Sequence, residues 1–148
     1  MDKNKGVRPL EILLVEDNPD DALLTVEALK EGKVHNVVHV AEDGVEALAY
    51  LRQEGDSPKP RPDLVLLDLN LPKKSGWEVL AEIKENPSLR RIPVVIMTSS
   101  DDQRDVNNAY DMYANCYITK PLDVDEFIGA VRKIEEFWVT LVRIPVAA

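Results

Sequence analysis

Acidic, hydroxyl and ammonium side chains stand at the ends of four apolar runs in this sequence. Glu16 and Asp17 follow LEILLV, Asp68 follows LVLL, Thr98 ends VVIMT, and Lys120 comes soon after CYI. Two carboxylates about 4 Å apart repel each other by about 4 kcal/mol at an effective dielectric constant near 20. A cluster of three therefore requires a cation or a shared proton. Because neither His nor Cys accompanies these carboxylates, a hard ion suits them, and Mg²⁺ fits best.

Five short apolar runs must position these side chains. Three of the runs are almost continuously apolar and rich in Val, Ile and Leu, which is typical of parallel strands buried on both faces. The five predicted strands are Leu10–Val15, Asn36–Val40, Leu64–Leu67, Val94–Met97 and Cys116–Ile118.

Helix start signals separate the predicted strands. Asn18 offers an N-cap before Pro19, and the acids Asp20 and Asp21 follow in the first turn, where we interpret them only as helix-start acids. Capping-box spacing recurs at Asp43…Glu46, Ser75…Glu78, Ser100…Gln103 and Asp123…Glu126. The alternation of strands and helices predicts a doubly wound α/β fold of five βα units, with function at the carboxyl ends of the strands.

Length and charge restrict the remaining possibilities. With 148 residues a single domain is expected, which we place at residues 9–136, after a flexible tail at 1–8. The 18 Lys and Arg against 27 Asp and Glu give a net charge of −9, which disfavours nucleic acid and anionic membranes as partners. The single cysteine, Cys116, excludes an intrachain disulfide, and no run approaches the roughly 18 apolar residues of a membrane span. We expect a cytoplasmic protein.

Four segments in order along the chain resemble the receiver domain of two-component response regulators. They are the acidic pair in LLVEDNP, the aspartate in LVLLDLNLP with Ser75-Gly76 after it, the hydroxyl in VVIMTSS, and YITKP. Each segment alone is a weak signal, but all of them at βα spacing cover nearly the whole chain. The resemblance implies a flavodoxin-like parallel sheet of order 2-1-3-4-5.

The resemblance also implies a role for each matching position. Asp68 would be the phosphoacceptor. Glu16, Asp17, Asp68 and the backbone carbonyl of Asn70 would hold Mg²⁺ as the cofactor.

The remaining matched residues would bind the phosphoryl group and report its presence. Thr98 and Lys120 would each contact a phosphoryl oxygen, and the Lys120–Pro121 peptide is expected to be cis. Tyr117 matches the aromatic residue that turns inward when such domains are phosphorylated.

The C-terminal part of the chain carries an apolar heptad pattern. Its members, separated by four and three residues in turn, are Phe127, Val131, Ile134, Trp138 and Leu141. We predict that these side chains, with an apolar extension over residues 137–148, form a homodimer contact; the alternative is that they pack onto their own sheet. This ending and the EDNPDDALL segment resemble single-domain response regulators that partner cyanobacterial phytochromes.

These observations favour a response regulator that accepts a phosphoryl group on Asp68 from a histidine kinase and then switches its contacts with an unknown downstream protein. The resemblance implies a kinase of the phytochrome type. Two alternatives remain open. One is an interaction module that works without phosphorylation. The other is a Mg²⁺-dependent aspartyl phosphohydrolase, but Asn70 stands where haloacid-dehalogenase phosphatases carry a second, proton-shuttling aspartate. We therefore do not expect a turnover enzyme.

Overall fold

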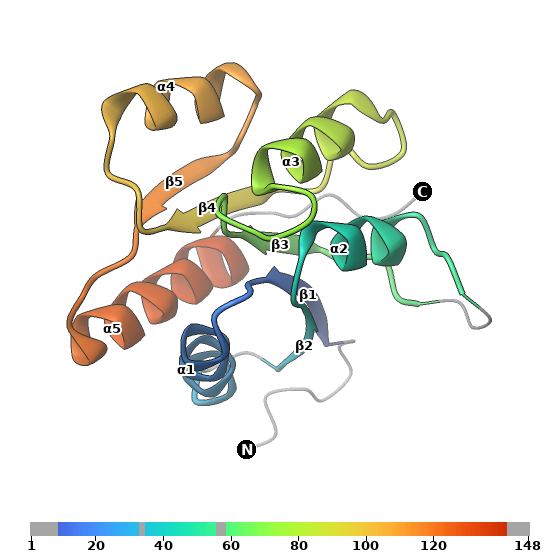
Figure 1. Ribbon diagram of the computed structural model, residues 1–148. Helices are drawn as coiled ribbons and strands as arrows, with labels where there is room; N and C mark the ends of the chain where they lie inside the picture. The colour runs from blue at the N-terminus through green and yellow to red at the C-terminus, as the bar shows by residue number, and fades with distance from the viewer. Residues whose placement is uncertain (1–8, 33–34, 56–58, 142–148) are drawn as a thin grey trace.

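Five parallel strands form one sheet in the computed structural model, which describes residues 9–32, 35–55 and 59–141. The strands are β1 (Leu10–Val15), β2 (Asn36–Ala41), β3 (Leu64–Leu67), β4 (Val94–Thr98) and β5 (Cys116–Thr119). Their order is β2-β1-β3-β4-β5, as the sequence predicts, and every neighbouring pair is parallel (Figure 1).

Helices cover both faces of the sheet, which explains the continuously apolar central strands. The helices are α1 (Pro19–Lys30), α2 (Gly44–Leu51), α3 (Gly76–Glu85), α4 (Gln103–Asp111) and α5 (Val124–Glu135). One buried cluster packs α2, α3 and α4 on one face of the sheet, and a second packs α1 and α5 on the other (Figure 1). No helix in the described ranges is long and apolar enough to cross a membrane.

The helices begin where the capping residues indicate, with one exception. Asn18, Asp43, Ser75 and Asp123 each accept a backbone N–H bond in the first turn of the helix that follows. The predicted cap at Ser100 is wrong, because Asp102 caps α4. The Ser100 hydroxyl instead donates to Asp105 Oδ2 at 2.6 Å, and the helix starts two residues later than a Ser100 cap would place it.

The apolar pattern of α5 packs onto its own sheet, which corrects the dimer prediction for three of its five residues. Phe127, Val131 and Ile134 are at most 3% exposed in a single chain, within the cluster that contains α1. The chain then continues as a π-helical segment, η1 (Glu136–Leu141), where Trp138 is half-buried against the same cluster. The Leu141 side chain and residues 1–8 and 142–148 lie outside what the structure describes.

Candidate functional site

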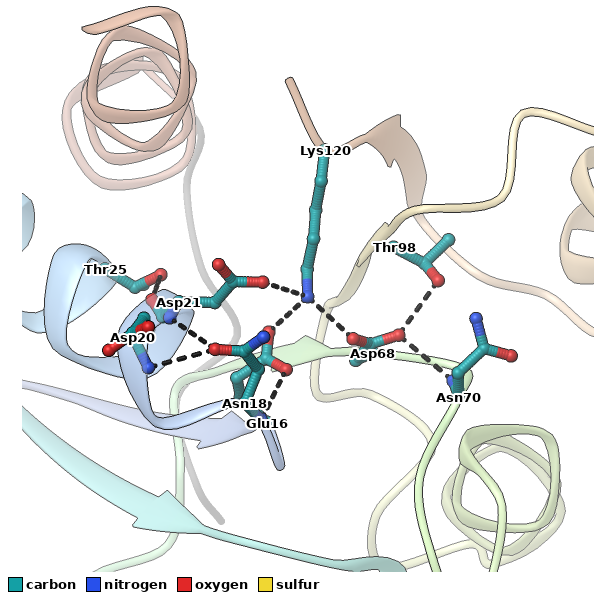
Figure 2. Close-up of polar contacts among 9 residues, drawn as sticks. All are labelled: Glu16, Asn18, Asp20, Asp21, Thr25, Asp68, Asn70, Thr98 and Lys120. Atoms are coloured by element: carbon teal, nitrogen blue, oxygen red, sulfur yellow. Dashed lines mark hydrogen bonds and ion pairs between the residues drawn. The ribbon is translucent and has the colours of Figure 1, made fainter. Parts of the chain in front are cut away.

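Four of the predicted site residues meet at the carboxyl edge of the sheet and are buried there (Figure 2). Glu16 follows β1, Asp68 follows β3, Thr98 ends β4, and Lys120 follows β5. Their exposed fractions run from 0% for Thr98 to 9% for Lys120. Burial strengthens the interactions among these charges, because water screens them little.

Backbone contacts fix the position of Asp68. Its N–H donates to the Val15 carbonyl at 3.0 Å, and the N–H of Gly76 donates to the Leu69 carbonyl at 2.9 Å. A Cβ atom at Gly76 would lie 2.2 Å from the Asp68 carbonyl oxygen, so only glycine allows α3 to approach β3 this closely. The start of α3 therefore holds the backbone on which Asp68 stands.

The two carboxylate oxygens of Asp68 have different partners. Oδ1 accepts from the Thr98 hydroxyl at 2.9 Å and from the Asn70 backbone N–H at 3.0 Å. Oδ2 accepts from Lys120 Nζ at 2.7 Å. The sequence-based grouping of Asp68, Thr98 and Lys120 is therefore present as direct contacts.

The Lys120 ammonium group lies among three carboxylates rather than one. Besides Asp68, Nζ lies 2.6 Å from Glu16 Oε1 and 2.9 Å from Asp21 Oδ2. Burial disfavours the ammonium form, but hydrogen bonds to Asp68, Glu16 and Asp21 outweigh burial and raise the pKa of Lys120 above its usual value. Lys120 is therefore a permanent cation at physiological pH.

The contact with Asp21 was not predicted, since the sequence indicates only a helix-start acid at that position. Asp21 and Lys120 are 99 residues apart, and nothing in the spacing of either residue links them. The bond arises because α1 begins directly after the acidic pair, with Asn18 accepting from the Asp20 and Asp21 N–H groups. This first turn directs the Asp21 side chain across to Lys120 (Figure 2).

Burial disfavours the charged form of the Glu16 carboxylate. Burial raises its pKa to about 7, against the opposing effect of Lys120, and the charge of Asp68 adds to the increase. One ammonium serves three carboxylates here, so negative charge is in excess at the site, and Glu16 is the most deeply buried of the three.

The acidic cluster is suited to a divalent cation. Glu16, Asp17 and Asp68 each offer a carboxylate oxygen within 4.8 Å of the others, and Asp17 is exposed to solvent. The N–H bond from Asn70 to Asp68 brings the Asn70 backbone beside the cluster. An all-oxygen donor set with one open side matches the preference of Mg²⁺, which keeps several of its waters.

Tyr117 connects β5 to the loop after β4. Its half-buried hydroxyl donates to the Ser100 carbonyl at 2.9 Å, two residues after Thr98. Its backbone N–H donates to the Tyr110 hydroxyl of α4 at 3.2 Å. Tyr117 thus contacts the segment that Thr98 begins, although it does not itself contact Asp68 in any described interaction.

The expected cis peptide before Pro121 is wrong, because the described residues contain no cis peptide bond. A trans X–Pro bond is favoured by about 0.5–1 kcal/mol in the absence of other constraints. Lys120 Nζ reaches its three carboxylates from the trans backbone, and the backbone N–H of Lys120 donates to the Thr98 carbonyl at 2.7 Å.

Residues 12–132 match the family of response regulator receiver domains. The chain belongs to this family. The receiver is 47% identical to response regulator Rcp1 of Synechocystis sp. over 140 residues, which are 94% of this chain and 95% of Rcp1.

Two solved structures resemble the receiver over nearly its whole length. The phosphorylated cyanobacterial phytochrome response regulator RcpA superposes with a TM-score of 0.91 at 49% identity, covering 94% of this chain and all of that one. The Mn²⁺-bound form of Rcp1 superposes with a TM-score of 0.90 at 47% identity, covering 93% and 100% respectively. The receiver is therefore similar over nearly its whole length to a cyanobacterial phytochrome response regulator and to Rcp1.

Proposed function

We propose that the receiver accepts a phosphoryl group on Asp68 from a histidine kinase and then changes its contacts with a downstream protein. The observation that carries this proposal is the environment of the Asp68 carboxylate. It is buried between the Thr98 hydroxyl and the Lys120 ammonium, and it lies beside two further carboxylates that can share a cation.

The contacts of Asp68 suit an attack on phosphorus. One Asp68 oxygen forms the new P–O bond while the P–N bond of a phosphohistidine breaks, and the bonding electrons leave with the imidazole. Lys120 and Thr98, which already donate to Asp68, are placed to donate to the phosphoryl oxygens where negative charge develops. They oppose the repulsion between the two anions.

Glu16, Asp17, Asp68 and the Asn70 carbonyl would hold the Mg²⁺ ion. Bound there, the ion would neutralise charge on the phosphoryl oxygens. The Mn²⁺-bound form of Rcp1 supports a divalent cation in a close relative.

The switch is proposed to run from Thr98 through the Ser100 loop to Tyr117. A phosphoryl group on Asp68 offers Thr98 new acceptor oxygens. In the loop that follows Thr98, the Ser100 carbonyl accepts a hydrogen bond from the Tyr117 hydroxyl. A change at Thr98 is thus transmitted to Tyr117 and to Tyr110 on α4. Asn70 offers no carboxyl for proton shuttling, so we propose one phosphoryl transfer onto the protein itself rather than substrate turnover.

We propose a phytochrome-type histidine kinase as the phosphoryl donor, which is in keeping with a cytoplasmic location. The support is the similarity to RcpA and Rcp1. Radiolabelled kinase of this type is expected to pass its label to the receiver within minutes and to leave an Asp68→Asn variant unlabelled. Faster transfer from an unrelated sensor kinase than from the phytochrome-type kinase would contradict the assignment.

A homodimer remains part of the proposal, with a contact that differs from the first prediction. Because Phe127, Val131 and Ile134 are buried in their own chain, the available apolar surface begins at Phe137, which is 51% exposed, and at half-buried Trp138. The proposed contact is η1 together with the extension after it.

A further inference from the structure

The Lys120 ammonium group has three N–H groups, and three different carboxylates lie within hydrogen-bonding distance of its Nζ. Glu16, Asp21 and Asp68 each have an oxygen within 2.9 Å of Nζ. An ammonium group has three donors and no more. A phosphoryl oxygen that binds Lys120 must therefore replace one of these carboxylates or share a donor with it.

Two of the three carboxylates have another use in the proposed chemistry. Asp68 becomes the acyl phosphate and loses its own negative charge, and Glu16 is a candidate metal ligand. Asp21 has no such use. It lies on α1, outside the group of carboxylates that converge within 4.8 Å, and its side chain is 25% exposed. Its contact with Lys120 thus persists as a competitor for the same N–H.

We propose that Asp21 is a positioning residue that holds Lys120 on the α1 side of the site and competes with phosphoryl oxygens for it. This inference rests on the proposed phosphorylation of Asp68. Asp21 also adds a negative charge to the site that receives the phosphoryl group. Both effects have the same direction, since each lowers the affinity of the site for a phosphoryl group and favours the unphosphorylated receiver.

Asp20 provides a matched control. It stands one residue earlier in the same first turn, and its N–H also donates to Asn18 Oδ1. Its carboxylate is exposed and makes no hydrogen bond or ion pair with any residue that the structure describes, and Figure 2 shows it away from Lys120. Asp20→Asn and Asp21→Asn therefore remove the same charge from the same helix end, but only Asp21→Asn weakens a bond to Lys120.

The experiment measures the affinity of beryllofluoride, a phosphoryl mimic, by calorimetry in saturating Mg²⁺. Asp21→Asn is expected to bind beryllofluoride about three- to tenfold more tightly than the parent receiver, the range for a charge-assisted bond at a partly exposed site. Asp20→Asn is expected to stay within about twofold. Asp21→Glu, which restores the charge with a longer reach, is expected to return the affinity toward that of the parent chain.

Thermal unfolding of each variant separates this role from a purely structural one. A weakened helix start lowers the melting temperature but does not raise the affinity for beryllofluoride. Unchanged or weaker beryllofluoride binding by Asp21→Asn would overturn the inference, as would an equal gain in Asp20→Asn. If the parent receiver bound no beryllofluoride at all, the proposed function would fail first and this inference with it.

Discussion

At the scale of single residues, the site holds more negative than positive charge, and burial disfavours the charged form of Glu16. Its pKa is about 7 in the folded chain, above the ordinary value of 4.5 that applies after unfolding. A carboxylic acid whose pKa rises on folding lowers stability progressively as the pH passes from the unfolded value to the folded one. The folded receiver therefore carries this cost in full only above about pH 7.

Glu16→Gln removes that charge and keeps an oxygen for Lys120. Without divalent ions, the variant is expected to melt about 3–6 °C above the parent receiver at pH 8, which is the effect of about 1–2 kcal/mol after allowance for screening. The difference should be much smaller at pH 5, where Glu16 is protonated in the folded chain and the pH is only slightly above the ordinary value of 4.5. Scanning calorimetry at both pH values measures this, and an equal gain at pH 5 would contradict the assigned cause.

At this scale the sequence predicts which residues gather but not all of their contacts. Glu16, Asp68, Thr98 and Lys120 are recognisable because each ends or closely follows an apolar run that must be a strand. Asp21 is not recognisable as a site residue, because an acid in the first turn of a helix is common and is explained by the helix dipole alone. Its contact with Lys120 depends on how α1 leaves β1, which no local pattern encodes.

At the scale of elements, the packing of α5 shows which surface the apolar face of the C-terminal heptad pattern contacts. A heptad pattern reports only that one face is apolar, and the face can meet either its own sheet or a second chain. Phe127 is 3% exposed and packs against β-strand residues and α1, so its burial is complete within one chain. The strands and most caps were predictable because their signals are local, whereas the partner of an amphipathic face is not.

Phe127→Ala should therefore lower the stability of the receiver, by about 3–5 kcal/mol, through the cavity that it leaves. Leu122→Ala is the control, since Leu122 in the preceding loop is fully exposed and its loss should change stability by no more than about 0.5 kcal/mol. Urea unfolding at several protein concentrations distinguishes the two roles. A Phe127→Ala loss that depended on protein concentration would indicate a contact between chains instead.

At the scale of the whole molecule, the arrangement separates the site from the proposed dimer contact. The site lies at the carboxyl ends of the strands, whereas η1 follows α5 as the chain runs away from Lys120 and the β5–α5 loop (Figure 1). α5 also spans the distance between them, with its N-cap Asp123 three residues after Lys120. One helix therefore connects the segment after Lys120 to η1 along the chain.

The dimer is tested by light scattering with size exclusion at micromolar concentration. The parent receiver is expected at twice the mass of one chain, and Phe137→Glu at the mass of one chain, because a charge is placed in an apolar contact. Leu23→Glu, which changes a similarly exposed leucine on α1, should leave the dimer intact. A monomeric parent receiver, or a dimer that survives Phe137→Glu, would contradict the proposed contact.

The central claim is that Asp68 accepts a phosphoryl group, and intact mass after incubation with acetyl phosphate tests it most directly. With Mg²⁺ the receiver is expected to gain the mass of one phosphoryl group. Chelation of the metal and the Asp68→Asn substitution should each abolish the gain, while Asp20→Asn should retain it. A gain of the same size in folded Asp68→Asn, or no gain and no beryllofluoride adduct in the parent receiver with Mg²⁺ bound, would contradict the account.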